Sequence, residues 1–335
     1  MRIAHILPAS VTFPLHTHNG RYEWVLQLAK LQASSGHDVT IYCNNSSRVD
    51  NIRTAGISHL SDDKKIDNIE TFRLALKGDH DIYHSHFDNL HYEISHETTK
   101  PIVYTQHWWP VEKTIELAQT TSSKNVWAVP PTNYMYKVDI QSGIRTKGYI
   151  YHGIDLTVFH PSQDKKNGRL LFVSRISPEK NLEIALSTAN NTGLGLDIIG
   201  KVPLKNQKYW AQLQSMIDGV QIKYLGPKSH DELTRYYTSA RALIFASDVN
   251  EPFGLVAIES QACGTPIIMK SGGSRGELLV EGKTGFLCDT KDDFITAAKA
   301  ADKLNTSDCI SFAKKFDVKR MVRQYDELYY GLISD

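Results

Sequence analysis

Two glutamates separated by seven residues, Glu251 and Glu259, are the residues whose types and spacing point most directly to chemistry. The segment between them begins Pro-Phe-Gly, follows an apolar, β-branched run at residues 242–246 and opens into a helical pattern. Backbone N–H groups at such a helix start favour an anion, commonly phosphate. A carboxylate two turns into the helix lies on the same face and can accept hydrogen bonds from a ribose diol. The segment therefore predicts a nucleotide site, with phosphate at the turn and ribose at Glu259.

Two cations follow an earlier predicted strand at residues 170–174. Arg175 ends that strand, and Lys180 lies about one turn further on, after a Ser-Pro pair that is typical of a helix start. Alone, such a pair also fits a solvated basic rim. Beside Glu251–Glu259 we interpret Arg175 and Lys180 as ligands of a departing diphosphate.

Histidines are concentrated in the first third of the chain. Strand alternation after Asp81 puts His84 and His86 on one face, and we expect His86 to recognise a hydroxyl of a sugar or acceptor. A zinc site with Asp88 is the alternative, but no Cys or Glu stands at a recognisable ligand spacing. The Asp79-His-Asp81 pattern precedes its strand, at the end remote from ligands, and predicts a solvated loop. We therefore predict no metal site.

The segment 14–20 follows the first predicted strand and precedes the first helix. Gly20 would let backbone N–H groups approach a diphosphate closely, although an ordinary strand-to-helix connection has the same pattern.

Strand and helix patterns alternate along the whole chain, which predicts parallel sheets covered by helices. The polar stretch 159–168 divides the alternation, so we expect two Rossmann-like domains facing each other across a cleft that holds the substrate. The expected strands are 3–7, 39–43, 82–84, 102–106, 126–129, 148–151, 170–174, 196–199, 222–225, 242–246 and 266–269. The expected helices are 22–34, 179–190, 205–217, 230–239, 254–262 and 318–332.

Composition limits the classes of function. The chain has 335 residues, 41% of them hydrophobic and 22% charged, as in a globular protein of two domains. A formal net charge of +1 gives no electrostatic case for nucleic acid or a membrane surface. The four cysteines share no C-x-x-C spacing, and no apolar run reaches 18 residues, so we expect a cytoplasmic protein without a transmembrane segment.

These motifs resemble the family-four retaining glycosyltransferases of the GT-B fold, over essentially the whole chain. The most specific match is Glu251–Glu259, which fits the family's Glu-x(7)-Glu signature without a gap. Supporting matches come in the family's order: Gly36–Thr40, His84–His86, Gly153–Asp155 followed by Phe159 and Pro161, Val173–Ile176 with Lys180, Tyr224–Gly226, Gly264–Pro266, Gly272–Gly273 with Glu277, and Gly282–Leu287.

The resemblance implies a role for each matching residue. Arg175 and Lys180 would neutralise the diphosphate, Glu259 would hold the ribose, and His86 would lie beside the transferred sugar. The transferred sugar and distal phosphate would meet Glu251 and the backbone of Phe253, Gly254 and Leu255, and Gly20 would lie near the phosphates. The implied domains are an acceptor-binding domain at 1–160, a donor-binding domain at 161–317 and a helix at 318–335 that crosses back to the first domain.

Two departures from the family pattern concern these roles. Asn19 stands before Gly20 where relatives have a second glycine, which bears on how that loop contacts a diphosphate. Arg275, in the unusual Ser-Arg-Gly segment before Glu277, either bears on the donor or has no role at the site.

The implied activity is metal-independent transfer of a sugar, with retention, from a nucleotide-diphosphate sugar to a hydroxyl acceptor. UDP-hexose is the first expected donor and GDP-mannose the next; the acceptor is a small molecule, a glycan or a lipid-linked hydroxyl compound. The leaving diphosphate would take the acceptor's proton, so no cofactor and no protein nucleophile is expected. The alternatives are a non-hydrolysing sugar-nucleotide epimerase and a catalytically silent nucleotide-sugar-binding protein.

Overall fold

The computed structural model describes residues 1–15, 19–58, 60–121, 124–248 and 251–334. It contains two compact units: unit 1 is Met1–Tyr151 together with the segment from Lys319 onward, and unit 2 is His152–Val318. Residues 16–18, within the loop expected to approach a diphosphate, lie outside the described residues.

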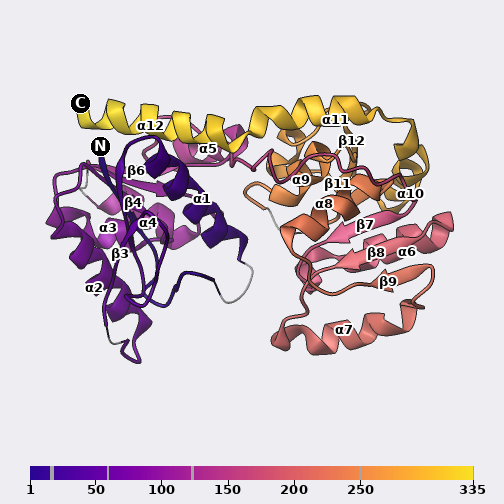
Figure 1. Cartoon of the computed structure of the whole chain (residues 1–335), viewed down its shortest axis with the longest axis horizontal. Helices are drawn as coiled ribbons and strands as arrows, with labels where there is room; N and C mark the ends of the chain where they lie inside the picture. The colour runs from indigo at the N-terminus through magenta and orange to yellow at the C-terminus, as the bar shows by residue number, and fades with distance from the viewer. Residues whose placement is uncertain (16–18, 59, 122–123, 249–250, 335) are drawn as a thin grey trace. The chain divides into compact units, whose positions relative to one another are not determined.

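Unit 1 is built on a six-stranded parallel sheet in the order β3-β2-β1-β4-β5-β6. Helices alternate with these strands along most of the unit (Figure 1). The strands are β1 (Arg2–Ile6), β2 (Asp38–Tyr42), β3 (Arg53–Ala55), β4 (Ile82–Ser85), β5 (Ile102–Thr105) and β6 (Val126–Val129). The helices are α1 (Gly20–Ser34), α2 (Lys64–Leu76), α3 (Leu90–Ile94), α4 (Glu112–Thr120), α5 (Asn133–Gln141) and α12 (Val318–Ser334).

Unit 2 repeats the scheme, with the strand order β12-β11-β10-β7-β8-β9. The strands are β7 (Leu170–Val173), β8 (Leu196–Ile199), β9 (Ile222–Tyr224), β10 (Ala242–Phe245), β11 (Ile267–Lys270) and β12 (Gly285–Cys288). The helices are α6 (Leu182–Thr192), α7 (Gln207–Leu213), α8 (His230–Ser239), α9 (Leu255–Ala262), α10 (Lys291–Ala300) and α11 (Thr306–Ala313).

Both sheets follow the doubly wound Rossmann order, in which the connections run outward in opposite directions from two central strands. These are β1 and β4 in unit 1 and β7 and β10 in unit 2. In unit 2 the central strands are almost wholly buried and apolar, as expected of parallel strands covered on both faces. In unit 1 they are also largely buried but include the polar residues His5, His84 and Ser85. Ligands of such sheets bind at the carboxyl ends of these strands, so each unit has one preferred place for a site.

The sequence prediction for residues 148–151 is wrong, because they form no strand. Ile150 N donates one hydrogen bond to the Pro130 carbonyl at 3.1 Å. The neighbouring edge strand β6 is followed by Pro130 and Pro131, whose nitrogens carry no hydrogen and cannot extend a ladder. Two edge strands, β3 and β12, were not predicted. The helix expected at 205–217 is shorter, with α7 flanked by 3-10 turns.

The helix α12 belongs to unit 1, although unit 2 separates it from the rest of that unit in sequence. Figure 1 shows it in yellow, alongside α1. Tyr325 and Tyr329 are fully buried on its inner face, where their hydroxyls meet polar side chains of β4 and β5. Among the described residues, no helix is long and apolar enough to cross a membrane.

Candidate functional site

The cations and carboxylates predicted in unit 2 lie at the carboxyl ends of its two central strands. Lys180 follows β7 and Glu251 follows β10. The Lys180 ammonium forms an ion pair with the Glu251 carboxylate, and the two side chains are only 14% and 15% exposed. Residues 71 positions apart in sequence are thus brought together by the strand order, at the place where a doubly wound sheet binds ligands.

Arg175 lies on the same loop as Lys180 but points to a more open environment. Its guanidinium is 3.7 Å from the Glu179 carboxylate, and its side chain is half exposed. The loop is fixed to the end of β10 through hydrogen bonds to the Glu179 carbonyl, from Asp248 N at 2.9 Å and from Ser247 Oγ at 3.2 Å. A rigid loop carrying two cations suits an anionic ligand, because little ordering is left to be done on binding.

The turn into α9 requires a glycine. Gly254 has φ of 107° and ψ of 69°, a left-handed conformation that side chains disfavour, and an added Cβ would lie 3.2 Å from the Phe245 ring. Phe253 is buried and packs on Phe316, with ring centroids 5.6 Å apart. The helix begins at Leu255, so its first N–H groups lie directly after this anchored turn.

Glu259 lies within α9 and is buried, with 7% of its surface exposed. Its Oε2 accepts a hydrogen bond of 2.8 Å from the Tyr237 hydroxyl, which comes from α8. Burial beside this carboxylate raises the pKa of Tyr237 well above its ordinary value, so the phenol keeps its proton and its role as donor. Tyr237 therefore fixes the direction of Glu259, and sequence reasoning did not identify it.

Arg275 is buried and holds loops together. Its guanidinium donates to the carbonyls of Ser271 and Ser247, both at 2.8 Å, and so joins the ends of β11 and β10. The preceding residue, Ser274, donates to the Glu251 carbonyl at 3.1 Å. The unusual Ser-Arg-Gly segment thus supports the backbone around Glu251.

In unit 1, Gly20 is the first residue of α1, and Asn19 is its N-cap. The Asn19 side chain accepts from Tyr22 N at 3.5 Å, so the residue that replaces the usual glycine stabilises the helix start. A Cβ added at Gly20 would meet no atom within 4 Å. The space beside this glycine is open in the described part of the chain.

His86 lies in a buried cluster of imidazoles at the two central strands of unit 1. The register pairs His5 of β1 with His84 of β4, and His86 follows β4. His86 is fully buried: its Nε2 is 3.1 Å from His5 Nδ1 and its Nδ1 is 3.3 Å from His107 Nε2. His107, which follows β5, is partly exposed. Between the two, His107 is the imidazole with surface available to a ligand, and the sequence reasoning did not name it.

His5, His84 and His86 form the one group of three potential metal ligands among the described residues. Their ring nitrogens already have hydrogen-bonding neighbours, including Thr105 at 2.8 Å and Tyr329 at 2.6 Å on the two sides of His84. Desolvation lowers the pKa of His5 to about 4 and that of His86 well below its ordinary value. Neutral, hydrogen-bonded imidazoles of this kind form a satisfied polar core.

The other predicted ligand candidates lie outside this cluster. Asp88 is exposed and 3.6 Å from Arg21. Asp81 is 2.7 Å from the guanidinium of Arg2, and Asp79 pairs with the same group, at the amino ends of β1 and β4.

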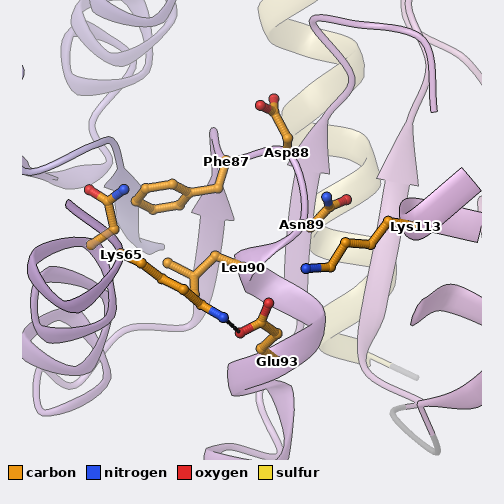
Figure 2. A pocket seen from close by; sticks show the side chains of 8 residues that line it. Lys65, Phe87, Asp88, Asn89, Leu90, Glu93 and Lys113 are labelled. Atoms are coloured by element: carbon orange, nitrogen blue, oxygen red, sulfur yellow. Dashed lines mark ion pairs between the residues drawn. The ribbon is translucent and has the colours of Figure 1, made fainter. Parts of the chain in front are cut away.

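A cavity of about 310 Å³ opens in unit 1, where the loops after β3, β4 and β5 lead into α2, α3 and α4. Figure 2 shows its apolar wall, made by Phe87 and Leu90, and the ion pair of 2.8 Å between Lys65 and Glu93. Lys113 approaches from α4. The remaining lining residues are Asn68, Asp88 and Asn89. Cations, amides and an aromatic ring at one opening suit a polyhydroxy compound.

The sequence of unit 2 decides the family. Residues 156–317 match the family model described as glycosyl transferases group 1. This part of the chain belongs to the group 1 glycosyl transferases. The resemblance drawn from the motifs is thereby confirmed at the level of the family. Curated relatives of the group 1 domain include a probable sucrose-phosphate synthase of Thermosipho melanesiensis, 30% identical over 204 residues, which are 56% of this chain and 48% of that protein.

A second relative is a D-inositol 3-phosphate glycosyltransferase of Nocardioides, 31% identical over 173 residues, which are 43% of this chain and 37% of that protein. The chain thus matches about half or less of the length of these two curated relatives.

Solved structures match this chain over its whole length. HepE of Anabaena in complex with UDP and glucose has a TM-score of 0.80 at 17% identity, covering 99% of this chain and 100% of that chain. Sucrose-phosphate synthase of Thermosynechococcus elongatus has a TM-score of 0.82 at 17% identity, covering 99% of each. At this identity the likeness concerns the fold, and the predicted GT-B fold is confirmed.

Proposed function

We propose that the protein is a retaining glycosyltransferase that moves a hexose from a nucleotide-diphosphate sugar to a hydroxyl acceptor without a metal. The observation that carries the proposal is the set of groups at the carboxyl ends of β7 and β10. Lys180 and Glu251 are paired there, the helix start at Leu255 follows, and Glu259 lies buried further along α9. Phosphate, sugar and ribose each have a group of suitable chemistry in this set.

The cations act on the leaving group. Breaking the bond between the sugar and the diphosphate develops negative charge on the phosphate oxygens and positive charge on the anomeric carbon. Lys180 and Arg175 neutralise the former, and the N–H groups at the start of α9 add to the same positive field. When a donor binds, Lys180 exchanges its partner, and the Glu251 carboxylate becomes available to a sugar hydroxyl.

The nucleoside is held by Glu259. Its carboxylate accepts hydrogen bonds from the ribose diol, in a direction set by Tyr237. Gly20, with open space beside it, allows the phosphates to approach the start of α1. UDP-hexose is the first donor we propose, since HepE of Anabaena was solved with UDP-glucose. GDP-mannose is the next.

Unit 1 binds the acceptor. The cavity beside Phe87 offers hydrogen-bond donors from Lys113 and the amides of Asn68 and Asn89. Such a lining suits a compound with several hydroxyl groups, and the names of curated relatives include inositol 3-phosphate. In the imidazole cluster, His107 takes the sugar contact that the family pattern suggested for His86, and His86 acts through it.

The chemistry needs no protein nucleophile. The acceptor attacks on the face from which the diphosphate leaves, its proton passes to a leaving phosphate oxygen, and the anomeric configuration is retained.

The four cysteines are buried and free, which supports a protein of a reducing compartment such as the cytoplasm.

Donor screening followed by product analysis tests the proposal. A nucleotide sugar present at 100 times its dissociation constant stabilises the folded protein by about 2.7 kcal/mol, so thermal shift identifies the donor. The protein is then incubated with that donor and a panel of polyol and sugar phosphates, and release of the nucleoside diphosphate is measured.

Acceptor-dependent release of UDP with a glycosylated product supports transfer. Conversion of the donor to its epimer without an acceptor would establish the epimerase alternative instead. Tight donor binding with no turnover across the panel, under conditions in which a known transferase turns over, would favour the silent binding protein.

A further inference from the structure

A series of hydrogen bonds connects α12 to His107, the histidine that we propose contacts the sugar. Asp326 Oδ1 accepts from Gln32 Nε2 at 3.0 Å, and Gln32 Oε1 lies 2.8 Å from His5 Nε2. His5 Nδ1 lies 3.1 Å from His86 Nε2, and His86 Nδ1 lies 3.3 Å from His107 Nε2. Five side chains from five segments are therefore joined in series.

The chemistry of the groups gives this series a direction. An ionised carboxylate only accepts, so Asp326 turns the Gln32 amide until its NH₂ faces α12 and its oxygen faces His5. His5 must then carry its proton on Nε2 and present a lone pair at Nδ1. By the same step His86 carries its proton on Nε2 and accepts at Nδ1, and His107 donates from Nε2.

Burial keeps the linked histidines in these tautomers. His5, Gln32 and His86 are all 0% exposed, so a second proton on either imidazole would place an uncompensated charge in the interior. The rings of His5 and His86 are stacked, with centroids 5.4 Å apart, and Trp24 contacts His107 edge-on at 5.2 Å. The imidazoles therefore have little freedom to turn over and exchange their nitrogens.

We propose that Asp326 and Gln32 are positioning residues: through His5 and His86 they fix His107 in the tautomer that has its proton on Nε2 and a lone pair on Nδ1. This inference rests on the proposed function, in which His107 contacts the ligand. A histidine held in that form accepts a hydrogen bond from a ligand hydroxyl at Nδ1.

Nitrogen-15 NMR of the histidine side chains tests the tautomers directly, without any substrate. In the full-length protein at pH 7.5, His5, His86 and His107 are expected to show single Nε2–H tautomers. Assignment comes from His5→Gln, His86→Gln and His107→Gln, each of which removes one set of signals. Observation of an Nδ1–H tautomer at His86 or His107 in the wild-type protein would overturn the proposal.

Asp326→Asn tests the origin of the direction. An asparagine both donates and accepts, so the Gln32 amide can reverse, and a second tautomer is expected to appear at His5, His86 and His107 together. Glu327→Gln is the matched control, because Glu327 is an exposed carboxylate on the same helix. Its spectrum is expected to equal that of the wild type.

The double variant Asp326→Asn with Gln32→Glu exchanges the amide and the carboxylate. A glutamate at 32 accepts from His5 Nε2, so the single tautomers are expected to return while the number of charges stays the same. Failure of this variant, when folded, to restore the tautomers would refute the directional role of Asp326.

Kinetics separate the positioning role from the proposed function. With the cognate donor, kcat is expected to fall about tenfold or more in Asp326→Asn, with donor KM little changed, and to recover in the double variant. If the tautomers behave as described but the protein has no transferase activity, the directional series of hydrogen bonds is supported and the proposed function is rejected. Tautomers that shift with kcat unchanged would reject the positioning role.

Discussion

Replacing Asp139 by asparagine is expected to stabilise unit 1 at neutral pH and to leave its stability unchanged near pH 4. Asp139 lies on α5 and is 0% exposed. Its Oδ1 accepts from Gln106 Nε2 at 3.1 Å, whereas its Oδ2 and the Gln106 Oε1 are buried without a hydrogen-bond partner among the described residues. Burial raises the pKa of this carboxyl from an ordinary 3.8 to about 7.

The direction of the pH dependence follows from this raised pKa. Below about pH 4 the carboxyl is protonated in both the folded and the unfolded chain, and the residue carries no penalty. Between about pH 4 and pH 7 the unfolded chain releases the proton while the folded chain keeps it, so the free energy of unfolding falls. A difference of about 3 pKa units corresponds to about 4 kcal/mol, which is an upper value for the loss above pH 7.

Asparagine removes the ionisation and keeps the shape. Its oxygen retains the bond from Gln106 Nε2, and its NH₂ can donate to the Gln106 oxygen. The gain in stability over the wild type is therefore expected to be near zero at pH 4, about 2 kcal/mol near pH 5.5 and up to about 4 kcal/mol at pH 8.

Urea denaturation followed by tryptophan fluorescence measures this gain. Trp24, Trp108, Trp109 and Trp127 lie in unit 1, against a single tryptophan in unit 2, so the signal reports mainly the unit that contains Asp139. The control is Glu327→Gln, an equally conservative change at an exposed carboxylate of the same unit. A gain that is independent of pH, or a loss of stability at pH 8, would refute the assignment of a protonated buried carboxyl.

Further predictions concern the donor. Alanine at Arg175 or Lys180 removes a charge that meets the leaving diphosphate, so kcat should fall by roughly 10²–10³-fold while the protein stays folded; wild-type kcat in either variant would exclude that residue from the role. Glu259→Gln should raise donor KM by an amount corresponding to about 1–3 kcal/mol, while binding of a sugar phosphate without ribose should be unaffected; equal losses for both would remove Glu259 from the ribose site. Turnover should persist in excess EDTA, and proton NMR of early product should show the donor's anomeric configuration; abolition by EDTA with rescue by Mn²⁺ would direct attention to His5, His84 and His86, and an inverted product would make a general base necessary.

The arrangement of strands was accessible from the sequence because most strands are buried on both faces and read as short apolar runs. β6, β8 and α8 have the predicted bounds, and several other strands differ by one residue. The edge strand β3 has only three residues and none of them is buried, so it carries no hydrophobic signal. The run at 148–151 has strand-like residues but lacks a partner that can pair with it.

The proposed donor residues of unit 2 could be named from the sequence because they stand in two short segments, one after β7 and one after β10. Their supports could not, because these come from other elements. Tyr237 is 22 residues from Glu259, and Ser274 is 23 residues from Glu251. The series of hydrogen bonds from Asp326 to His107 is harder still to predict from the sequence. It depends on the register that sets His5 beside His84 and on Asp326, which is 294 residues from Gln32.

The position of α12 has a consequence for how the protein is made on the ribosome. Synthesis proceeds from the N-terminus, and domains generally fold as units while the chain emerges. Unit 1 cannot complete its interior in this way, because the hydroxyls that meet His84 and Thr105 belong to Tyr329 and Tyr325, which are translated only after all of unit 2. Until then the nascent sheet of unit 1 carries an uncovered polar interior. The first unit to be synthesised is therefore expected to be the last to become resistant to proteolysis.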